Sequence, residues 1–354
     1  MKKRTFSPFW VFSAMLFTLQ FGMLFGGIRN FNEINEGKIY AIIICTVIVC
    51  FSVFLISRSM HNPEKIKNSK IFRAFSLFLG VYFILRSALD LRGYDDISHL
   101  YLLEKTPSIL ISIIILITAY FLFRKGLRSL ALNAQAFFWV AAIPIVFLIG
   151  ASLFFVDFRE LFAFFSQSSV TNIPNQIYPT LSSLMGFELI FFIILGNERK
   201  NGTEKAAIWG IVVAGGLNII FTMVLAGIFS VPGMNNIVFQ LSEVSKIIGA
   251  LPSLVTERAD IIFVCIQLLI TVMQTALTQY MAAICFESFF KTKDYKFFGI
   301  VQIPITALAA FLCARVNATA FLYTLLPICN AVLLALPLLW FLITKIKRKK
   351  GGKA

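Results

Sequence analysis

The stretch Ile177-Tyr-Pro-Thr-Leu-Ser-Ser-Leu-Met-Gly-Phe-Glu188-Leu-Ile-Phe-Phe-Ile-Ile-Leu195 places one acidic residue inside a long apolar segment. Glu188 lies about twelve residues from one end, or roughly 18 Å along a helix that rises about 1.5 Å per residue. In a bilayer, a carboxylate facing lipid there costs at least ~2.5–3.5 kcal/mol, so we expect Glu188 to face protein or a ligand. Two serines and Gly186 precede it, and small polar residues, a glycine and a buried acid together are typical of a midplane ligand site.

The composition predicts a polytopic membrane protein. The 354 residues are 58% hydrophobic with a mean hydropathy of +0.84, and only 14% are charged. Soluble proteins carry about 25% charged residues.

Ten apolar segments of about 18 residues or more are long enough to cross a bilayer. They are 8–27, 39–57, 72–91, 106–123, 132–155, 176–196, 206–230, 260–290, 297–314 and 318–344. Ten divides into five plus five, and because five is odd the second set enters the membrane inverted. We therefore expect one all-α membrane domain, 1–354, with repeats 8–155 and 176–344 and a basic tail, 345–354.

The basic residues predict the orientation of these spans. Of the 32 lysines and arginines, 23 fall in the two ends and in alternate connections, all on one side. The positive-inside rule then places both termini in the cytoplasm. The net charge of +15 is therefore explained by topology and attraction to lipid headgroups rather than by nucleic-acid binding.

Spans one and six occupy equivalent places in the two repeats, and both carry an interruption. Span one contains Gln20-Phe21-Gly22, followed by Gly26 and Gly27, and span six contains the serines, Gly186 and Glu188. Paired interruptions in corresponding spans indicate a transporter-type binding site, although glycines also permit close helix packing.

Several stretches resemble the B-subunit family of spore germinant receptors, the spore germination permeases of the amino acid–polyamine–organocation transporter superfamily. They are Phe6-Ser-Pro-Phe-Trp10, Gln20-Phe-Gly22, Gly186-Phe-Glu188, Glu257-Arg-Ala-Asp260 and Lys293-Asp-Tyr-Lys296. The resemblance implies a ten-helix inverted-repeat fold with a pocket between broken helices one and six and helices three and eight. It also implies a nutrient-sensing subunit of a complex in the spore inner membrane, with A-type and C-type partner subunits.

The chain departs from the family pattern at three places, which puts the ligand rather than the fold in question. Leu24 stands where the family often has a second glycine, and no proline follows it. Leu189–Leu195 lacks the proline that often follows the glutamate, and Gln267 replaces a usual aromatic residue.

A zwitterionic nutrient needs donors for its carboxylate and acceptors for its ammonium. Unpaired N–H groups at a helix break supply the donors, so the two breaks are candidates. The predicted ligand-binding residues are Gln20, Phe21, Gly22, Tyr82, Ser183, Gly186, Phe187, Glu188, Thr271 and Gln274. Glu188 is expected at the ammonium, while Tyr82 and Phe187 cover the apolar part of the ligand.

Charged and polar residues in spans three and eight have two interpretations each. Arg86 and Asp90 are spaced i,i+4, so Arg86 either neutralises Asp90 or Glu188 or senses the charge of Glu188. Glu257, Arg258 and Asp260 are expected to fasten the outer end of span eight. The stripe of Thr271, Gln274, Thr275, Thr278 and Gln279 either lines a pocket or bonds neighbouring helices.

The sequence contains no pattern typical of an enzyme, a metal site or a cofactor site. Its two histidines, His61 and His99, fall in expected loops, and there is no phosphate-binding glycine loop. We expect a nutrient-sensing receptor subunit or, alternatively, an amino acid transporter coupled to protons through Glu188. A purely structural membrane scaffold would leave Glu188 and the polar stripe unexplained.

Overall fold

The computed structural model describes residues 8–17, 37–59, 70–101, 105–166, 173–183, 186–195, 202–237, 240–249, 259–292 and 294–315. Every secondary-structure element in these ranges is helical, so the predicted all-α architecture is confirmed. The elements are α1 (Phe9–Leu16), α3 (Gly37–Ser59), α5 (Lys70–Tyr101), α6 (Ser108–Phe123), α7 (Leu127–Ser152), η2 (Leu153–Phe155), α8 (Phe158–Ser166), α9 (Ile173–Ser183), α10 (Leu189–Leu195), α11 (Thr203–Asn236), α12 (Gln240–Gly249), α13 (Ala259–Phe290) and α14 (Tyr295–Arg315). Nine of the ten predicted spans contain one of these helices, and the tenth, 318–344, lies outside the described residues.

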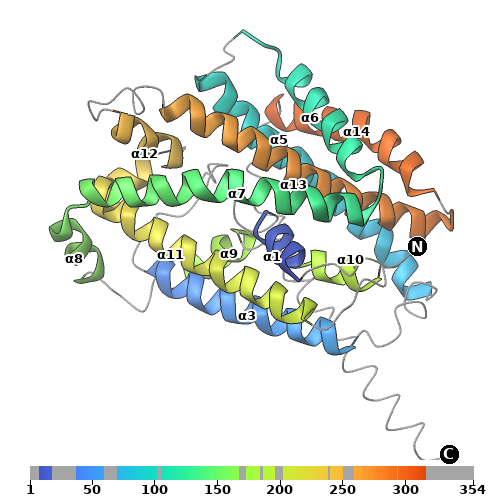
Figure 1. Ribbon diagram of the computed structural model, residues 1–354, viewed down its shortest axis with the longest axis horizontal. Helices are drawn as coiled ribbons and strands as arrows, with labels where there is room; N and C mark the ends of the chain where they lie inside the picture. Colours follow the sequence, from blue (N-terminus) through green and yellow to red (C-terminus); the bar gives the residue numbers. More distant parts are fainter. Residues whose placement is uncertain are drawn as a thin grey trace, which may run out of the picture.

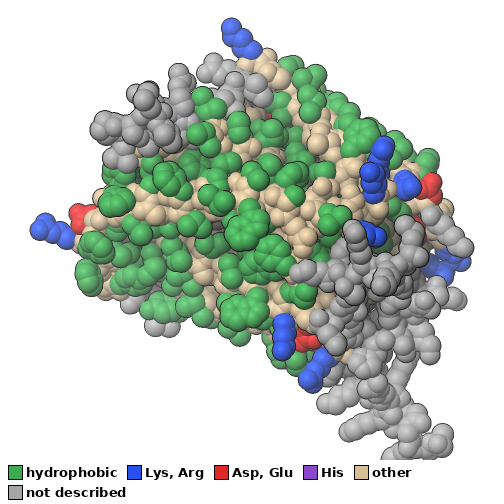
Figure 2. Space-filling view, viewed as in Figure 1, with side chains coloured by type: hydrophobic (Ala, Val, Ile, Leu, Met, Phe, Trp, Pro, Cys, Tyr) green, Lys and Arg blue, Asp and Glu red, His purple; other side chains and the backbone are tan. Residues whose placement is uncertain are grey.

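The protein is an integral membrane protein. Five described helices are long and apolar enough to cross a bilayer: Gly37–Arg58, Leu127–Phe155, Thr203–Ser230, Ile261–Phe290 and Tyr295–Cys313. Large apolar side chains such as Val47, Ile143 and Phe147 are more than half exposed, as expected for side chains that contact lipid. Figure 2 shows a face covered mainly by hydrophobic side chains, with lysines and arginines near its margins.

Helix α13 lies at the centre of the bundle. In its most apolar window 72% of the residues are buried, against 28% for α7, which lies at the periphery. Alanines 276, 282 and 283 of α13 are fully buried, and such small side chains let helices approach closely. Helix α13 packs along α5 and contacts α6, α7 and α14, while α3 packs against α9 and α11 (Figure 1).

Helix α5 is longer than the sequence predicted, because residues 93–101 continue the helix where a loop was expected. His99 is therefore a helical residue. The polar residues of this segment pair along the helix: Arg92 forms ion pairs with Asp95 and Asp96, and His99 Nε2 lies 3.3 Å from Asp95 Oδ1. These i,i+3 and i,i+4 pairs stabilise helical backbone in a segment whose polarity resembles a loop.

Two short helices lie in the long connections of the chain. Helix α12 confirms the amphipathic helix predicted within 231–257, and α8 lies in the connection before span six, where the sequence predicted no helix. Both are placed at the same end of the bundle in Figure 1. Helix α11 reaches this end with a kink at Ser230, whose φ of 58° is not helical, two residues before Pro232.

Candidate functional site

The sixth span is broken at the position that the sequence predicted. Helix α9 ends at Ser183 and α10 begins at Leu189, with a turn over residues 186–188. Gly186 has φ of 124°, which is strained for any residue with a side chain, so glycine suits this position. The N–H of Leu189 donates to Gly186 O at 3.1 Å and that of Phe191 to Glu188 O at 3.0 Å, so the new helix begins with tight i,i+3 bonds.

Glu188 lies in this break and is held by donors from two directions. Its Oε1 accepts a hydrogen bond from the Tyr82 hydroxyl of α5 at 3.1 Å. Its Oε2 accepts one from the Gly186 N–H at 2.7 Å. The residue is only 4% exposed, so the prediction that the carboxylate avoids lipid is satisfied by protein donors.

Arg86 lies between two carboxylates. Its Nη1 is 3.8 Å from Glu188 Oε2, and its Nε is 4.0 Å from Asp90 Oδ2. The sequence left open which acid Arg86 neutralises, and the structure shows ion pairs with both. The side chains of Arg86 and Glu188 are each 5% exposed, whereas that of Asp90 is 21% exposed. Tyr82, Arg86 and Asp90 are spaced by four residues, so they line one face of α5.

Aromatic rings surround the ionic group. Phe187, between Gly186 and Glu188 in the turn, is 2% exposed. The ring of Tyr82 packs edge-on against Phe83, which in turn contacts Phe192 of α10 with centroids 5.5 Å apart. These contacts join α5 to the second half of the sixth span. The predicted role of Tyr82 and Phe187 in covering a ligand stays a prediction.

The polar stripe of α13 is buried, and part of it bonds helices together. Gln279 Nε2 donates to Ser87 Oγ of α5 at 3.0 Å and to Thr306 Oγ1 of α14 at 2.9 Å. Gln302 Nε2 of α14 donates to the carbonyl of Gln279 at 2.9 Å. The Thr278 hydroxyl instead donates within α13, to the carbonyls of residues 274 and 275 at 3.1 Å.

The other two stripe residues, Thr271 and Gln274, are both 5% exposed. Their proposed contact with a ligand stays a prediction. The sequence did not single out Gln302 and Thr306, although polar residues four positions apart inside an apolar span were a usable signal.

Several predicted site residues fall where the structure gives no side-chain detail. Gln20, Phe21, Gly22, Glu257 and Arg258 lie outside the described residues, so the interruption of span one is not among the observed features. Ser183 ends α9 and Asp260 belongs to the first turn of α13, but only their backbone is described.

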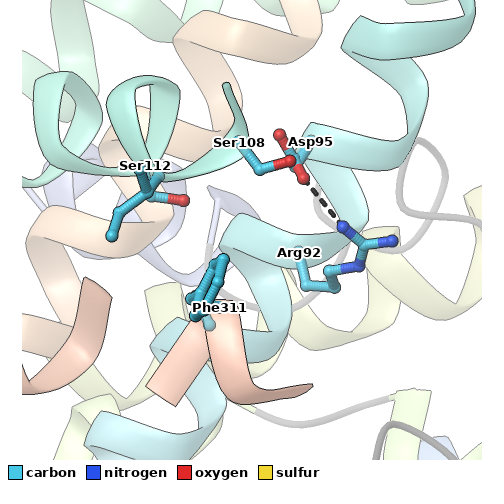
Figure 3. A pocket seen from close by; sticks show the side chains of 7 residues that line it. Arg92, Asp95, Ser108, Ser112 and Phe311 are labelled. Carbon is cyan, nitrogen blue, oxygen red and sulfur yellow. Dashed lines mark hydrogen bonds and ion pairs between the residues drawn. The ribbon is translucent and has the colours of Figure 1, made fainter. Parts of the chain in front are cut away.

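A second polar cluster, which the sequence assigned to a loop, lies where α5, α6 and α14 meet. Arg92 Nη1 donates to Asp95 Oδ2 at 2.8 Å, and His99 Nε2 lies 3.1 Å from Ser108 Oγ. A small pocket beside it is lined by Arg92, Asp95, Ser108, Ile109, Ser112, Ala310 and Phe311 (Figure 3). Asp95 is 2% exposed, so these contacts supply its buried carboxylate with donors.

Metal-binding side chains do not gather in the part of the chain that the structure describes. No group of three or more His, Cys, Asp or Glu residues in these ranges is placed to hold an ion. The site around Glu188 is therefore organised by one arginine, one tyrosine and a backbone N–H.

Comparison with solved structures identifies the fold. The chain is similar to a Na⁺-coupled sialic acid symporter, with a TM-score of 0.63, 12% identity, and coverage of 95% of this chain and 79% of the symporter. It is also similar to a manganese transporter of Eremococcus coleocola, with a TM-score of 0.55, 13% identity, and coverage of 94% and 76%. The fold is thus the polytopic, inverted-repeat helical fold of such transporters, as predicted.

Comparison of sequences identifies the family. The chain is 23% identical over 361 residues to the Bacillus subtilis (strain 168) protein named "Putative spore germination protein YfkT", with 97% of each chain covered. Residues 63–319, which are most of the chain, match the family described as "Spore germination protein". These relatives are permeases and transporters rather than enzymes, and they support a membrane protein that senses or transports a small molecule. The chain belongs to the spore germination protein family.

Proposed function

We propose that the chain is the nutrient-sensing transmembrane subunit of a spore germinant receptor. It binds a small nutrient, such as an amino acid, at the break in the sixth span. The buried ionic group of Tyr82, Arg86 and Glu188 carries this proposal, because it joins α5 to the break at the depth where transporter folds bind ligands. A ligand that changes these contacts shifts the balance between two arrangements of the bundle, and partner subunits respond to that shift.

The proposal includes its setting. The subunit lies in the spore inner membrane with both termini in the cytoplasm, and it acts with A-type and C-type germinant receptor subunits. Family membership supports a role in germination, and the basic connections support the orientation.

Germination of deletion spores tests this function. Spores lacking the chain, and the same spores complemented with wild type, Glu188→Gln or Glu243→Gln, are exposed to a panel of amino acids, sugars and nucleosides, and the fall in optical density is followed. We expect at least one response to be lost on deletion, restored by wild type and Glu243→Gln, and weakened by Glu188→Gln. Glu243 is a suitable control because its side chain is 37% exposed on α12. Deletion spores that respond normally to every nutrient in the panel would refute the receptor role.

A working transporter coupled to protons is the second candidate function, favoured by the burial of a single acid in a transporter fold. Uptake of labelled amino acids into vesicles containing the purified protein, driven by a pH gradient, measures it directly. Transport predicts uptake that Glu188→Gln abolishes. If no nutrient is taken up while deletion spores lose a response, the transporter hypothesis is wrong and the receptor proposal stands.

A further inference from the structure

The buried ionic group around Arg86 contains more negative than positive charge. Asp90 and Glu188 both form ion pairs with Arg86, so two carboxylates share one guanidinium. The two oxygens of Glu188 each accept a hydrogen bond, from Tyr82 and from Gly186. Excess charge inside a membrane protein is costly unless a counter-charge compensates it.

The unsatisfied part of this group is the carboxylate of Asp90. Its Oδ2 is buried and has no hydrogen-bond partner among the described residues, and its ion pair with Arg86 Nε is long, at 4.0 Å. Its side chain is also the most exposed of the three, at 21% against 5% for Arg86 and Glu188. Asp90 is therefore the member of the group that an incoming molecule reaches most easily, and it has the most to gain from a donor.

We propose that Asp90 binds a positively charged amine of the nutrient, so that the ligand is an amino acid or another amine rather than a neutral sugar. This inference rests on the proposed nutrient-binding function and specifies the chemical class of its ligand. An ammonium supplies the missing positive charge and gives Asp90 Oδ2 a charge-assisted hydrogen bond.

The spacing of Arg86 and Asp90 also suits a zwitterion. The two side chains stand one turn apart on the same face of α5 with opposite charges. A ligand carboxylate pairs with the guanidinium while the ligand ammonium pairs with Asp90, so one long internal ion pair is replaced by two shorter ones. Arg86 is then released from Asp90 and remains bound to Glu188, which connects ligand binding to the break in the sixth span.

A series of compounds that differ only in charge tests the inference. The probes are the twenty L-amino acids, their N-acetyl derivatives, the corresponding decarboxylated amines, and glucose and fructose. The readouts are the thermal stability of the purified full-length protein in lipid nanodiscs and the germination of complemented deletion spores. We expect amino acids or amines to stabilise the protein and to trigger germination, and the N-acetyl derivatives and sugars to do neither.

Variants of Asp90 test its role in binding. Asp90→Asn should raise the half-saturating concentration of an active amine at least about tenfold, which is the loss expected for a charge-assisted hydrogen bond. Asp90→Glu, which keeps the charge, should recover part of this loss. Asp96→Asn is the matched control because Asp96 lies on the same helix, is 39% exposed and pairs with Arg92 instead. Folding of each variant is checked by size-exclusion chromatography before binding is measured.

Three results would overturn the inference. One is stabilisation by a neutral sugar or an N-acetyl amino acid as large as that by the free amino acid. Another is an Asp90→Asn variant that binds the active amine like wild type. The third is stabilisation by sodium chloride but not by choline chloride, with no effect of any amine, which would assign Asp90 to an inorganic cation. Each leaves the nutrient-sensing function intact, whereas normal germination of deletion spores would overturn that function instead.

Discussion

Removal of Arg86 should cost the protein far more stability than removal of its partner Glu188. Arg86→Gln leaves two carboxylates that faced the guanidinium at 3.8 and 4.0 Å without a counter-charge. Breaking a buried ion pair from one side typically costs about 3–5 kcal/mol, because the remaining charge stays desolvated. We expect a loss in this range for Arg86→Gln.

Glu188→Gln should be milder, because it removes one of the two competing negative charges. A glutamine carbonyl can still accept the Gly186 N–H, and the Tyr82 hydroxyl can turn to accept from the amide. The cost is then the difference between a charge-assisted and a neutral hydrogen bond, about 1–2 kcal/mol. The double variant should be less destabilised than the sum of the two single variants, with a coupling of about 1–3 kcal/mol.

Reversible unfolding of purified protein in mixed detergent–lipid micelles, followed by tryptophan fluorescence, measures these differences. Lys246→Gln serves as the control, since it removes a cation from an ion pair with Glu243 whose side chains are 49% and 37% exposed. Exposed ion pairs contribute about 0–1 kcal/mol. Equal losses for Arg86→Gln and Glu188→Gln, or strictly additive effects, would refute the argument that Arg86 balances two buried acids.

Three further predictions concern the break, the helix interface and the orientation. Gly186→Ala should destabilise the protein by about 1–3 kcal/mol because of the positive φ, while Gly150→Ala, where an added methyl group meets nothing within 4 Å, should be neutral or slightly stabilising in the same unfolding assay. Gln279→Leu should cost about 1–3 kcal/mol by removing the donor shared by α5 and α14, and a variant as stable as wild type would show that this network contributes nothing. A cysteine placed at Lys246 should react with a membrane-impermeant maleimide added outside oriented vesicles, whereas one at Lys125 should react only after permeabilisation. The reverse pattern would contradict cytoplasmic termini.

The central features of the candidate site were predictable because each leaves a local signal in the sequence. An acid in an apolar span must be compensated by protein, and a glycine two residues earlier marks the break, so Gly186 and Glu188 could be identified from chemistry alone. Helix α12 was predictable for a similar reason, since its apolar residues recur at helical spacing within a polar connection.

Other features depend on contacts that no local pattern encodes. Arg92, Asp95 and His99 resemble a loop in composition, yet their pairing along the helix extends α5 beyond the expected span. The partners of Gln279 lie on two other helices, so its role required the tertiary arrangement. Arg86 was expected to choose between two acids, and only the packing of α5 against the break places it within reach of both.

Helix α5 has two kinds of contact, and the difference between them indicates where the molecule can change. Through Ser87 it is fixed to α13 and α14 by neutral hydrogen bonds that a ligand cannot easily exchange. Through Tyr82 and Arg86 it holds the sixth-span break by a hydrogen bond of 3.1 Å and an ion pair of 3.8 Å, which are sensitive to any charge that enters the site. A change in charge at Asp90 therefore alters the contacts of α5 with the break before it alters those with α13. Since a break of this kind has no continuous helical hydrogen bonding to preserve, it is the element that can move at the lowest cost.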